Sequence, residues 1–400
     1  MTIAVCFTNF GPYHLARLRA LSSRLGERGD RLIAYEVAGS ERTYPWSRNR
    51  REEPFEWITL FPDQVLETIE PMACRPAMVR ALDRDRPDAL YVAGYSRPES
   101  IAAARWARHQ GRPAILMSES QAIDRPRVWW KELIKKRRVS LFDAGLVGGR
   151  RHLDYLVRLG MPRNRVALGY NAVDNAYFAA RARSWREDPD GRAGLPSVLY
   201  FLTVCRFVRD KNLVRLIGAF ARYRQHCDAS RAWDLVLCGD GPGAAEVERA
   251  IVQSGYAQAI HRPGFLQVDL LSRWYAHAAA FVLPSLLEPW GLVVNEAAAC
   301  GLPLLVSTRA GCAPTLVPEP DGTTGGRFDP MDSEAMSTQL AWMATCPDDD
   351  RRAMGLRAAE TVSHWGPDRF ALGALEALDF AQVARQRTRT RTSWAATKGR

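Results

Sequence analysis

Short runs rich in β-branched and aromatic residues alternate with amphipathic stretches along most of the chain, and this alternation limits its fold more than any other feature. In the first half, strand-like and helix-like runs follow one another at 2–8, 15–25, 31–37, 89–95, 99–109, 113–118, 143–149 and 151–160. A strand, a helix and a second strand form the unit from which parallel sheets are built. The first half is therefore expected to form a Rossmann-like domain.

The alternation stops in a polar stretch at 179–196 and then begins again. Turn-forming residues and weak hydrophobic periodicity make this stretch the expected interdomain linker. Further runs follow at 197–204, 212–223, 234–240, 244–255, 280–285, 291–301 and 302–307. The pattern predicts an α/β protein with two Rossmann-like, doubly wound domains, residues 1–178 and 197–366, whose strand carboxyl ends face each other across a cleft.

The C-terminal end departs from this pattern in two steps. Residues 367–384 predict one more helix, which we expect to return to the N-terminal domain. Residues 385–400 carry six Lys/Arg, no acid and no apolar period, which predicts a basic disordered tail.

Length and composition agree with two globular domains. The 400 residues exceed what one hydrophobic core usually organises, and hydrophobic residues make up 47% of them. The N-terminus lacks the basic segment and cleavage site of a signal peptide, and no apolar run reaches membrane-spanning length. The eight scattered cysteines form no CxxC pair and are expected to be buried free thiols. These features predict a soluble, cytoplasmic protein.

The segment PSLLEPWGLVVNEAAACGLPLLVS, at 284–307, contains the most informative motif. A strand, a short loop and a helix supply the residues expected to hold a ligand: Glu288, Pro289, Trp290, Gly291, Leu292 and Glu296. The unpaired amides of Gly291 and Leu292, at the positive end of the helix, suit a diphosphate. Glu288 and Glu296 are then placed to hold hydroxyls on either side. Acidic residues near a helix start also occur simply because they interact well with the helix dipole.

The spacing Glu288-x7-Glu296 resembles the signature of retaining glycosyltransferase family four, which has the GT-B fold. The resemblance extends over residues 195–365 and implies a nucleotide-diphosphate sugar as co-substrate. It implies that Glu288 contacts hydroxyls of the donor sugar and that Glu296 contacts the ribose. Trp290 stands where the family usually has Phe, which implies a differently shaped sugar pocket.

A second match lies in FLTVCRFVRDKNLVRLIGAF, at 201–220. Arg206 ends a strand and Lys211 opens the next helix, so both cations are expected on one loop. This element resembles the family's Arg…Lys-Asn pattern and implies that the two cations stabilise the leaving diphosphate. The glycine-rich turn with Gly239 and Gly241, and the segment around Phe265 where the family seats the nucleobase, fit the same resemblance.

In the N-terminal half, His14 and Glu119 are candidates for the acceptor side, and Gly11 is a candidate to bind the nucleotide sugar. Gly11, in the first turn between strand and helix, allows an acceptor or a phosphate to approach the backbone. His14 follows it and is placed to face the cleft, although a histidine at a helix start is more often an ordinary surface residue. Glu119 occupies the stretch where many family members have a histidine, so it is a candidate to bind the acceptor.

A metal site is not expected. Asp83-Arg84-Asp85 spells a DxD string of the kind that binds a metal–diphosphate in the other large glycosyltransferase fold, but it lies at a helix end, far in sequence from the donor motifs. Surface charge is the better interpretation of these residues. Arg206, Lys211 and the helix dipole can do the electrostatic work of a metal.

The motifs together predict an enzyme that transfers a sugar, with retention, from a nucleotide-diphosphate sugar to a hydroxyl of a sugar or lipid-linked acceptor. UDP is the preferred nucleotide from family frequency, and polysaccharide, glycolipid or other glycoconjugate biosynthesis is the expected setting. A GT-B sugar-nucleotide epimerase or phosphorylase is the main alternative. A basic nucleic-acid-binding protein is less favoured, because the net charge of +11 is concentrated in two local segments.

One of these basic segments, RPRVWWKELIKKRR at 125–138, carries seven Lys/Arg against one acid. Helical spacing would gather its large apolar residues on one side, flanked by cations: Trp129, Trp130, Leu133 and Ile134. Such a patch suits an anionic membrane, and it predicts peripheral attachment to the inner face. The alternative is that Trp129 and Trp130 pack into the domain core and that the cations are ordinary solvated charge.

Overall fold

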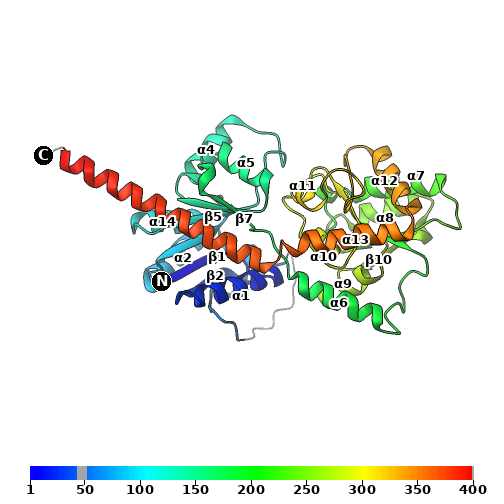
Figure 1. The fold of residues 1–400 in the computed structure, drawn as a ribbon, viewed down its shortest axis with the longest axis horizontal. Helices are drawn as coiled ribbons and strands as arrows, with labels where there is room; N and C mark the ends of the chain where they lie inside the picture. The colour runs from blue at the N-terminus through cyan, green and yellow to red at the C-terminus, as the bar shows by residue number, and fades with distance from the viewer. Residues whose placement is uncertain (43–51, 399–400) are drawn as a thin grey trace. The chain divides into compact units, whose positions relative to one another are not determined.

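The computed structural model describes residues 1–42 and 52–398. The chain divides into two compact units, one formed by Met1–Ala172 with Pro367–Arg400 and the other by Val173–Gly366. Each unit is built around one parallel β-sheet with helices packed against it (Figure 1). The prediction of two doubly wound, Rossmann-like α/β domains is confirmed.

The first unit contains a seven-stranded sheet in the order β3-β2-β1-β4-β5-β6-β7. Its strands are β1 (Thr2–Phe7), β2 (Arg31–Ser40), β3 (Glu56–Val65), β4 (Ala89–Ala93), β5 (Ala114–Ser118), β6 (Ala144–Val147) and β7 (Val166–Leu168). All neighbouring strands are parallel. The strand order changes direction between β1 and β4, so the topological switch point of this sheet lies there.

The helices of this unit are α1 (Pro12–Gly26), α2 (Cys74–Asp85), α3 (Pro98–His109), α4 (Trp129–Val139), α5 (Arg150–Arg158) and α14 (Pro367–Lys398), with short 3-10 turns η1 (Leu66–Thr68) and η2 (Arg163–Arg165). Alternate strand residues point to opposite faces. Ile3 and Val5 belong to the core under α1 and α14, whereas Ala4 and Cys6 belong to the core under α2 and α3. Both faces of the sheet are thus covered.

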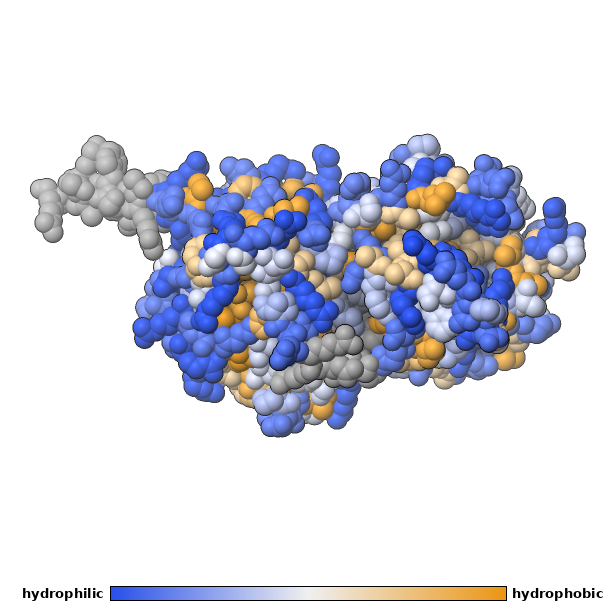
Figure 2. Space-filling view, turned by 60° about the horizontal axis from the view of Figure 1, so that its bottom comes forward, coloured by the Kyte–Doolittle hydropathy of each residue, from blue (hydrophilic) through white to orange (hydrophobic). Residues whose placement is uncertain are grey.

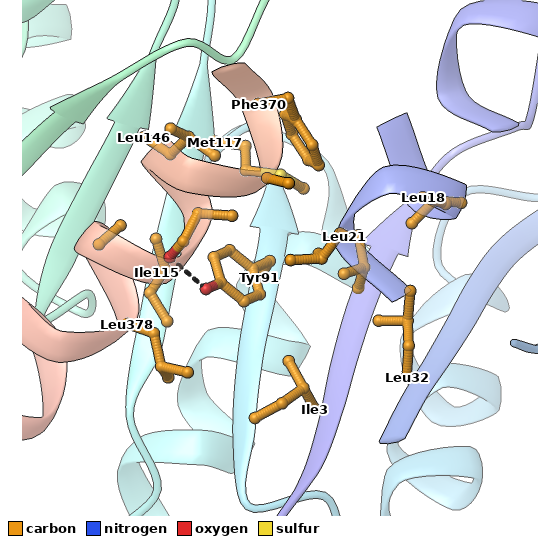
Figure 3. Packing of buried hydrophobic residues seen from close by; sticks show 14 of the residues in the cluster. Ile3, Leu18, Leu21, Leu32, Tyr91, Ile115, Met117, Leu146, Phe370 and Leu378 are labelled. Carbon is orange, nitrogen blue, oxygen red and sulfur yellow. Dashed lines mark hydrogen bonds between the residues drawn. The ribbon is translucent and has the colours of Figure 1, made fainter. Parts of the chain in front are cut away.

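Helix α14 is part of the core of the first unit although it comes last in the chain. Figure 3 shows Phe370 of α14 beside Met117 and Leu378 of α14 near Ile115 and Tyr91, on the same face of the sheet as Leu21 of α1. The Tyr91 hydroxyl donates a hydrogen bond to the carbonyl of Ala374. This bond satisfies a polar group inside an apolar core and ties the helix to β4.

The second unit contains a six-stranded parallel sheet in the order β10-β9-β8-β11-β12-β13. Its strands are β8 (Tyr200–Val204), β9 (Asp234–Cys238), β10 (Ile260–Gly264), β11 (Ala280–Leu283), β12 (Leu304–Ser307) and β13 (Gly325–Phe328). Its helices are α6 (Asn175–Glu187), α7 (Leu213–His226), α8 (Ala244–Gln253), α9 (Val268–His277), α10 (Leu292–Ala299), α11 (Ala313–Leu316), α12 (Ser333–Thr345) and α13 (Asp348–Ser363), with the turns η3 (Arg209–Lys211) and η4 (Ala257–Ala259). Here the switch point lies between β8 and β11.

The linker expected at 179–196 was wrong for its first part. Residues 175–187 form α6, which packs against α9 and α10 within the second unit. Phe178 and Ala182, one helical turn apart, are buried, and Arg186 donates to the carbonyls of Ala276 and Cys300. The many charged residues of this stretch concealed a short apolar stripe that is sufficient to anchor a helix.

The disordered tail expected at 385–400 was also wrong for the described residues. Helix α14 continues to Lys398, and the last two residues of the segment lie outside the described part. Arg385 donates to Asp143 at 2.8 Å, which holds the start of this extension against the unit. No proline or glycine interrupts the segment before Gly399, and extending an existing helix does not require a new nucleus.

The cysteine prediction is confirmed in that all eight thiols are unpaired, five of them buried and three partly buried. No helix within residues 1–42 and 52–398 is long and apolar enough to cross a membrane. On the face drawn in Figure 2, hydrophilic residues predominate and hydrophobic residues occur in small groups.

Candidate functional site

Two loops leave the second sheet side by side at its switch point. One follows β8 and contains Arg206 and Lys211, and the other follows β11 and contains Glu288. Because β8 and β11 are parallel neighbours, their carboxyl ends lie at the same edge of the sheet. The backbone joins the loops directly, since the amide of Leu286 donates to the carbonyl of Asp210 at 2.8 Å. Ligands of open α/β sheets bind at this kind of position.

Lys211 and Glu288 form an ion pair across the two loops. Lys211 Nζ lies 2.5 Å from Glu288 Oε2, and their side chains are only 18% and 9% exposed. Ser285 Oγ donates to the same carboxylate oxygen at 3.1 Å. Water screens such a partly buried pair less than it screens a surface pair. The structure therefore brings together Lys211 and Glu288, which with Arg206 are the residues predicted to act on the donor.

Arg206 is half-buried at the end of β8. No carboxylate among the residues that the structure describes forms an ion pair with it, so its charge is available to an anionic ligand.

Cys205, just before Arg206, is unsuited to nucleophilic chemistry. Burial raises the pKa of its thiol to about 12; Lys211 lowers this pKa and Glu288 raises it, both by smaller amounts. At neutral pH this thiol stays protonated and unreactive.

Asn212 holds the two loops together and was not among the predicted site residues. Its backbone is left-handed, with φ of 60°, and its side-chain amide donates to the carbonyls of Pro284 at 3.0 Å and Pro330 at 2.8 Å. Asparagine adopts this conformation more readily than most residues. An asparagine next to Lys211, directly before a helical pattern, was the available sequence signal for this role.

The start of α10 presents its first amides at the same edge of the sheet. Gly291 caps the helix with φ of 101°, a conformation that favours glycine. A Cβ atom there would also lie 3.1 Å from the Leu283 side chain and 3.3 Å from that of Glu288. The amides of Gly291 and Leu292 have no carbonyl one turn earlier in the helix, so they can donate to an anion.

Trp290 is buried in the interior of the second unit. Its position alone therefore gives no support to the expected change in the shape of a sugar pocket. Its Nε1 donates to Asn295 Oδ1 at 2.9 Å, and its ring packs against Trp365 with centroids 5.3 Å apart. Pro289, just before it, is half-buried.

Glu296 is fully buried, at 0% exposure, and accepts a hydrogen bond of 2.8 Å from the hydroxyl of Tyr275 in α9. The expectation that this carboxylate faces the ligand at a helix start, away from the core, was therefore wrong. The side chain of Glu296, in the second turn of α10, reaches Tyr275 in the interior of the unit. Tyr275 is separated from it by 21 residues, and the sequence contained no signal for the pairing.

The glycine-rich turn after β9 packs tightly against the loop that carries Arg206. A Cβ atom on Gly239 would lie 1.9 Å from the carbonyl oxygen of Cys205, and one on Gly241 would lie 2.6 Å from that of Phe207. Both glycines have positive φ, of 134° and 157°. Phe265, directly after β10, has an exposed ring. The predicted donor residues thus follow β8, β9, β10 and β11 at one sheet edge.

In the first unit, Gly11 and His14 interact with each other at the exit of β1. The amide of Gly11 donates to Nδ1 of His14 at 3.0 Å, so His14 caps the start of α1 and its Nε2 carries the proton. The His14 ring also packs against Phe7. This local role does not require a ligand. His152 repeats it by accepting from the amide of Gly149 at the start of α5.

Glu119 follows β5 and accepts a hydrogen bond from the side chain of Asn171. Arg17, a buried residue of α1, donates to the carbonyl of Ala172 at 3.1 Å and interacts electrostatically with Glu119. Burial lowers the pKa of the Arg17 guanidinium. His14 follows β1 and Glu119 follows β5, so both residues lie beyond the carboxyl ends of strands in the first sheet.

The DxD string lies at the end of α2, and its two aspartates have structural partners in α3 and β2. The indole of Trp106 donates to Asp83 at 2.7 Å, and the hydroxyl of Tyr35 donates to Asp85 at 2.6 Å. The hydrogen bond from Arg84 holds the pKa of Asp85 below its usual value, with Tyr35 adding to the effect. Within the described residues, no group of three or more His, Cys, Asp or Glu side chains is arranged to hold a metal ion.

Comparison with known proteins points in the same direction as this geometry. Residues 195–361, which lie within the second unit, match the family model for glycosyl transferases group 1. A sulfoquinovosyl transferase of Arabidopsis thaliana is 34% identical over 178 residues, which are 44% of this chain and 32% of that protein. The chain spans about a third to a half of the length of the curated relatives that it matches.

The likeness to solved structures extends over nearly the whole chain. A sucrose-phosphate synthase from Thermosynechococcus elongatus superposes with a TM-score of 0.71 at 20% identity, covering 97% of this chain and 99% of that chain. The HepE protein of Anabaena, solved with UDP and glucose, superposes with a TM-score of 0.70 at 16% identity, covering 95% and 99%. These likenesses show the GT-B fold that was expected from the sequence.

Proposed function

We propose that the chain is a glycosyltransferase that moves a sugar from a nucleotide-diphosphate sugar to an acceptor hydroxyl, with retention of the anomeric configuration. The observation that carries this proposal is the Lys211–Glu288 pair, which joins two loops at the switch point of the second sheet. The match of residues 195–361 to glycosyl transferases group 1 supports it.

In this proposal the diphosphate binds to fixed positive charge. Lys211 and Arg206 contribute cations from one loop, and the first amides of α10 add the positive end of a helix. Such donors stabilise the leaving diphosphate without having to reorganise during the reaction. The reaction therefore needs no metal ion in this account.

Glu288 binds hydroxyls of the donor sugar, and Phe265 and the turn with Gly239 and Gly241 contact the nucleoside. The ribose role of Glu296 stays in the proposal, with the added requirement that the side chains covering it move when the donor binds. UDP is the preferred nucleotide, and the UDP bound to the HepE protein of Anabaena supports this choice.

The acceptor is a sugar or a lipid-linked sugar that binds at the first unit, near Gly11, His14 and Glu119. In the proposed step, an oxygen of the donor phosphate takes the proton of the acceptor hydroxyl. The bond between the anomeric carbon and the diphosphate breaks, and the new glycosidic bond forms on the same face. The nucleoside diphosphate leaves, and no covalent enzyme intermediate is needed.

Acceptor-dependent release of a nucleoside diphosphate tests the proposal. The purified chain is incubated with UDP-, GDP- or ADP-sugars and a panel of acceptors, and products are identified by mass spectrometry and NMR. Lys211→Ala is expected to lower kcat/KM about 10- to 150-fold, because a hydrogen bond to a charged group contributes about 1.5–3 kcal/mol. Arg209→Ala, an exposed cation on the same loop, is the matched control and should change turnover less than about twofold.

Two results would contradict this function. Near-normal turnover in Lys211→Ala would remove the donor-site assignment. Conversion of the sugar nucleotide without an acceptor would indicate an epimerase, and release of a sugar phosphate in the presence of inorganic phosphate would indicate a phosphorylase.

A further inference from the structure

Helix α4 exposes its large apolar side chains instead of burying them. Trp129 is 79% exposed and Trp130 is 48% exposed, and Leu133 and Ile134 are exposed as well. Val139 is the buried residue of the helix. A helix in a globular domain normally directs such residues toward the core. A cluster of exposed apolar side chains of this size marks an interaction surface, and the core position considered for Trp129 and Trp130 is wrong.

The opposite side of α4 contacts the domain through polar groups. Lys135 Nζ donates to Glu132 Oε1 at 2.8 Å and to the hydroxyl of Tyr155 in α5 at 2.9 Å. Successive helix residues are rotated by about 100°. Glu132, Lys135 and Val139 therefore share one side, and the centre of the apolar set lies roughly 160° away from it. The apolar side chains point away from the domain.

Cations surround the apolar side chains. Lys131 Nζ lies 5.3 Å from the centroid of the Trp130 ring. Within the described residues, none of Lys131, Lys136 and Arg137 forms an ion pair, and neither does Arg138. The one acid of the helix, Glu132, is already occupied by Lys135 and Arg127. We name this set the α4 face: Trp129, Trp130, Leu133 and Ile134 with Lys131, Lys136, Arg137 and Arg138.

We propose that the α4 face docks on the surface of an anionic lipid bilayer and attaches the first unit to it as a peripheral membrane domain. Tryptophan rings settle among lipid headgroups, where one part of the ring is apolar and the other is wet. Four cations without carboxylate partners are attracted by anionic headgroups. A protein partner would have to supply both an apolar groove and a ring of acids, whereas an anionic bilayer presents both properties at every point.

The α4 face also lies close in the chain to the proposed acceptor side. Glu119 directly follows β5, and α4 begins ten residues later. Arg127 donates to the carbonyls of Ala122 and Gln121, which folds the connecting loop back toward the end of β5. If the proposed transfer is correct, this arrangement delivers lipid-linked acceptors to the first unit. The docking itself depends on the α4 face alone and does not rest on the proposed function.

Vesicle sedimentation tests the docking without any substrate. The full chain should sediment with vesicles that contain phosphatidylglycerol at low salt, and much less with vesicles of phosphatidylcholine alone or at high salt, where charges are screened. Lys136→Glu/Arg137→Glu/Arg138→Glu should weaken binding on the order of 100-fold, because each basic residue near the surface contributes about fivefold. Trp129→Gln/Trp130→Gln should weaken binding at both low and high salt.

A matched control separates the α4 face from net charge. Arg75→Glu/Arg80→Glu/Arg105→Glu changes three exposed arginines of α2 and α3, and so changes the net charge by the same amount. This control should bind vesicles like the unaltered chain. All variants should have the melting temperature of the unaltered chain and should transfer sugar to a soluble acceptor at its rate. A failure of docking is therefore distinguishable from a failure of the proposed function.

Three results would overturn the proposal. The first is failure of the full chain to bind phosphatidylglycerol vesicles at low salt. The second is an equal loss of binding in the α4 variant and the control variant. The third is binding of oligonucleotides, abolished by the α4 variant, in a chain that does not bind vesicles, which would assign the cations to nucleic acid.

Discussion

Lys211 and Glu288 stabilise each other's charge at the edge of the second sheet. The pair is mostly shielded from water, so a change that removes one charge leaves the other poorly compensated. A bound diphosphate carries more negative charge than one carboxylate and should compete for Lys211. We therefore expect donor binding to draw Lys211 from Glu288 toward the phosphates, which leaves the carboxylate of Glu288 to accept hydrogen bonds from sugar hydroxyls.

Glu296 provides a residue-scale prediction about function and stability together. Glu296→Gln keeps an acceptor for the Tyr275 hydroxyl and nearly the same volume, so its free energy of unfolding should fall by less than about 1 kcal/mol. Glu296→Ala leaves a cavity and removes an acceptor of the buried Tyr275 hydroxyl, and should lose about 2–4 kcal/mol. Urea unfolding measures both changes, and the turnover of the folded Gln variant should be reduced. Normal turnover in that variant would remove the ribose role.

At the residue scale, candidate site residues could be named from the sequence, whereas their hydrogen-bond partners could not. Arg206, Lys211 and Glu288 are recognisable because each stands at a fixed spacing from a helix start. Tyr275 and Asn212 were missed because their hydrogen bonds join segments far apart in the chain, and no local pattern encodes which residue a folded loop will meet. The contact of Trp290 with Trp365 was not predicted for the same reason, since it depends on tertiary packing.

At the scale of elements, the loops at the carboxyl edge of the second sheet depend on a turn whose glycines have positive φ and no room for a side chain. Gly239 combines a positive φ with close contact to the backbone of Cys205. The loop that carries Arg206 and Lys211 rests on this turn, because the amide of Phe207 donates to the carbonyl of Asp240 at 2.8 Å. A change in the turn should therefore displace the cations.

Gly239→Ala should destabilise the second unit by at least about 2 kcal/mol and weaken nucleotide binding, because the added methyl group meets backbone that has no room to move. Gly218→Ala is the matched control. Gly218 lies exposed in the middle of α7 with no atom near the added methyl group, so alanine should raise stability by about 0.5–1 kcal/mol. Thermal unfolding and nucleotide titration of both variants decide the matter, and equal stability of the two would contradict this account of the turn.

Element type was predictable wherever hydrophobic periodicity was strong, as in most strands of both sheets. It was not predictable in α6 or in the end of α14, where charged residues interrupt the apolar pattern. In α6, two buried residues and the hydrogen bonds of Arg186 are enough to hold a helix. In α14, the helix continues beyond the last residue that packs into the core, Ala381. Composition alone does not distinguish such helices from linkers and tails.

At the scale of the whole molecule, the alternation of strands and helices was sufficient to predict two doubly wound sheets. The order of the strands, which the structure gives, locates one switch point in each sheet. In the second sheet, the predicted donor motifs lie in the loops at this switch point. The two units contribute separate parts of the proposed reaction, with donor groups on the second and acceptor candidates on the first. For α4, the sequence allowed the apolar side chains either to be exposed or to pack into the core. Periodicity defines which residues share a face of a helix, but it does not say what that face contacts.

Chelation tests whether the cations of the second unit are sufficient for the reaction. Activity should be unchanged by EDTA, because Arg206, Lys211 and the α10 amides supply the positive charge. Asp83→Asn/Asp85→Asn should leave turnover unchanged as well, since these carboxylates hold Trp106 and Tyr35. Loss of activity on chelation that Mn²⁺ or Mg²⁺ restores, combined with an inactive double variant, would instead make these aspartates metal ligands.

The most direct test of the donor site is whether the chain distinguishes a nucleoside diphosphate from the matching monophosphate. Isothermal titration calorimetry with UDP, GDP and ADP and with their monophosphates measures this difference without any acceptor. For one nucleotide, the diphosphate should bind at least about tenfold more tightly, because the second phosphate reaches Lys211, Arg206 and the start of α10. Lys211→Ala should remove most of that advantage, while Arg209→Ala should preserve it. Equal affinities for diphosphate and monophosphate, or an advantage that Lys211→Ala leaves intact, would contradict the assignment of this sheet edge as the donor site.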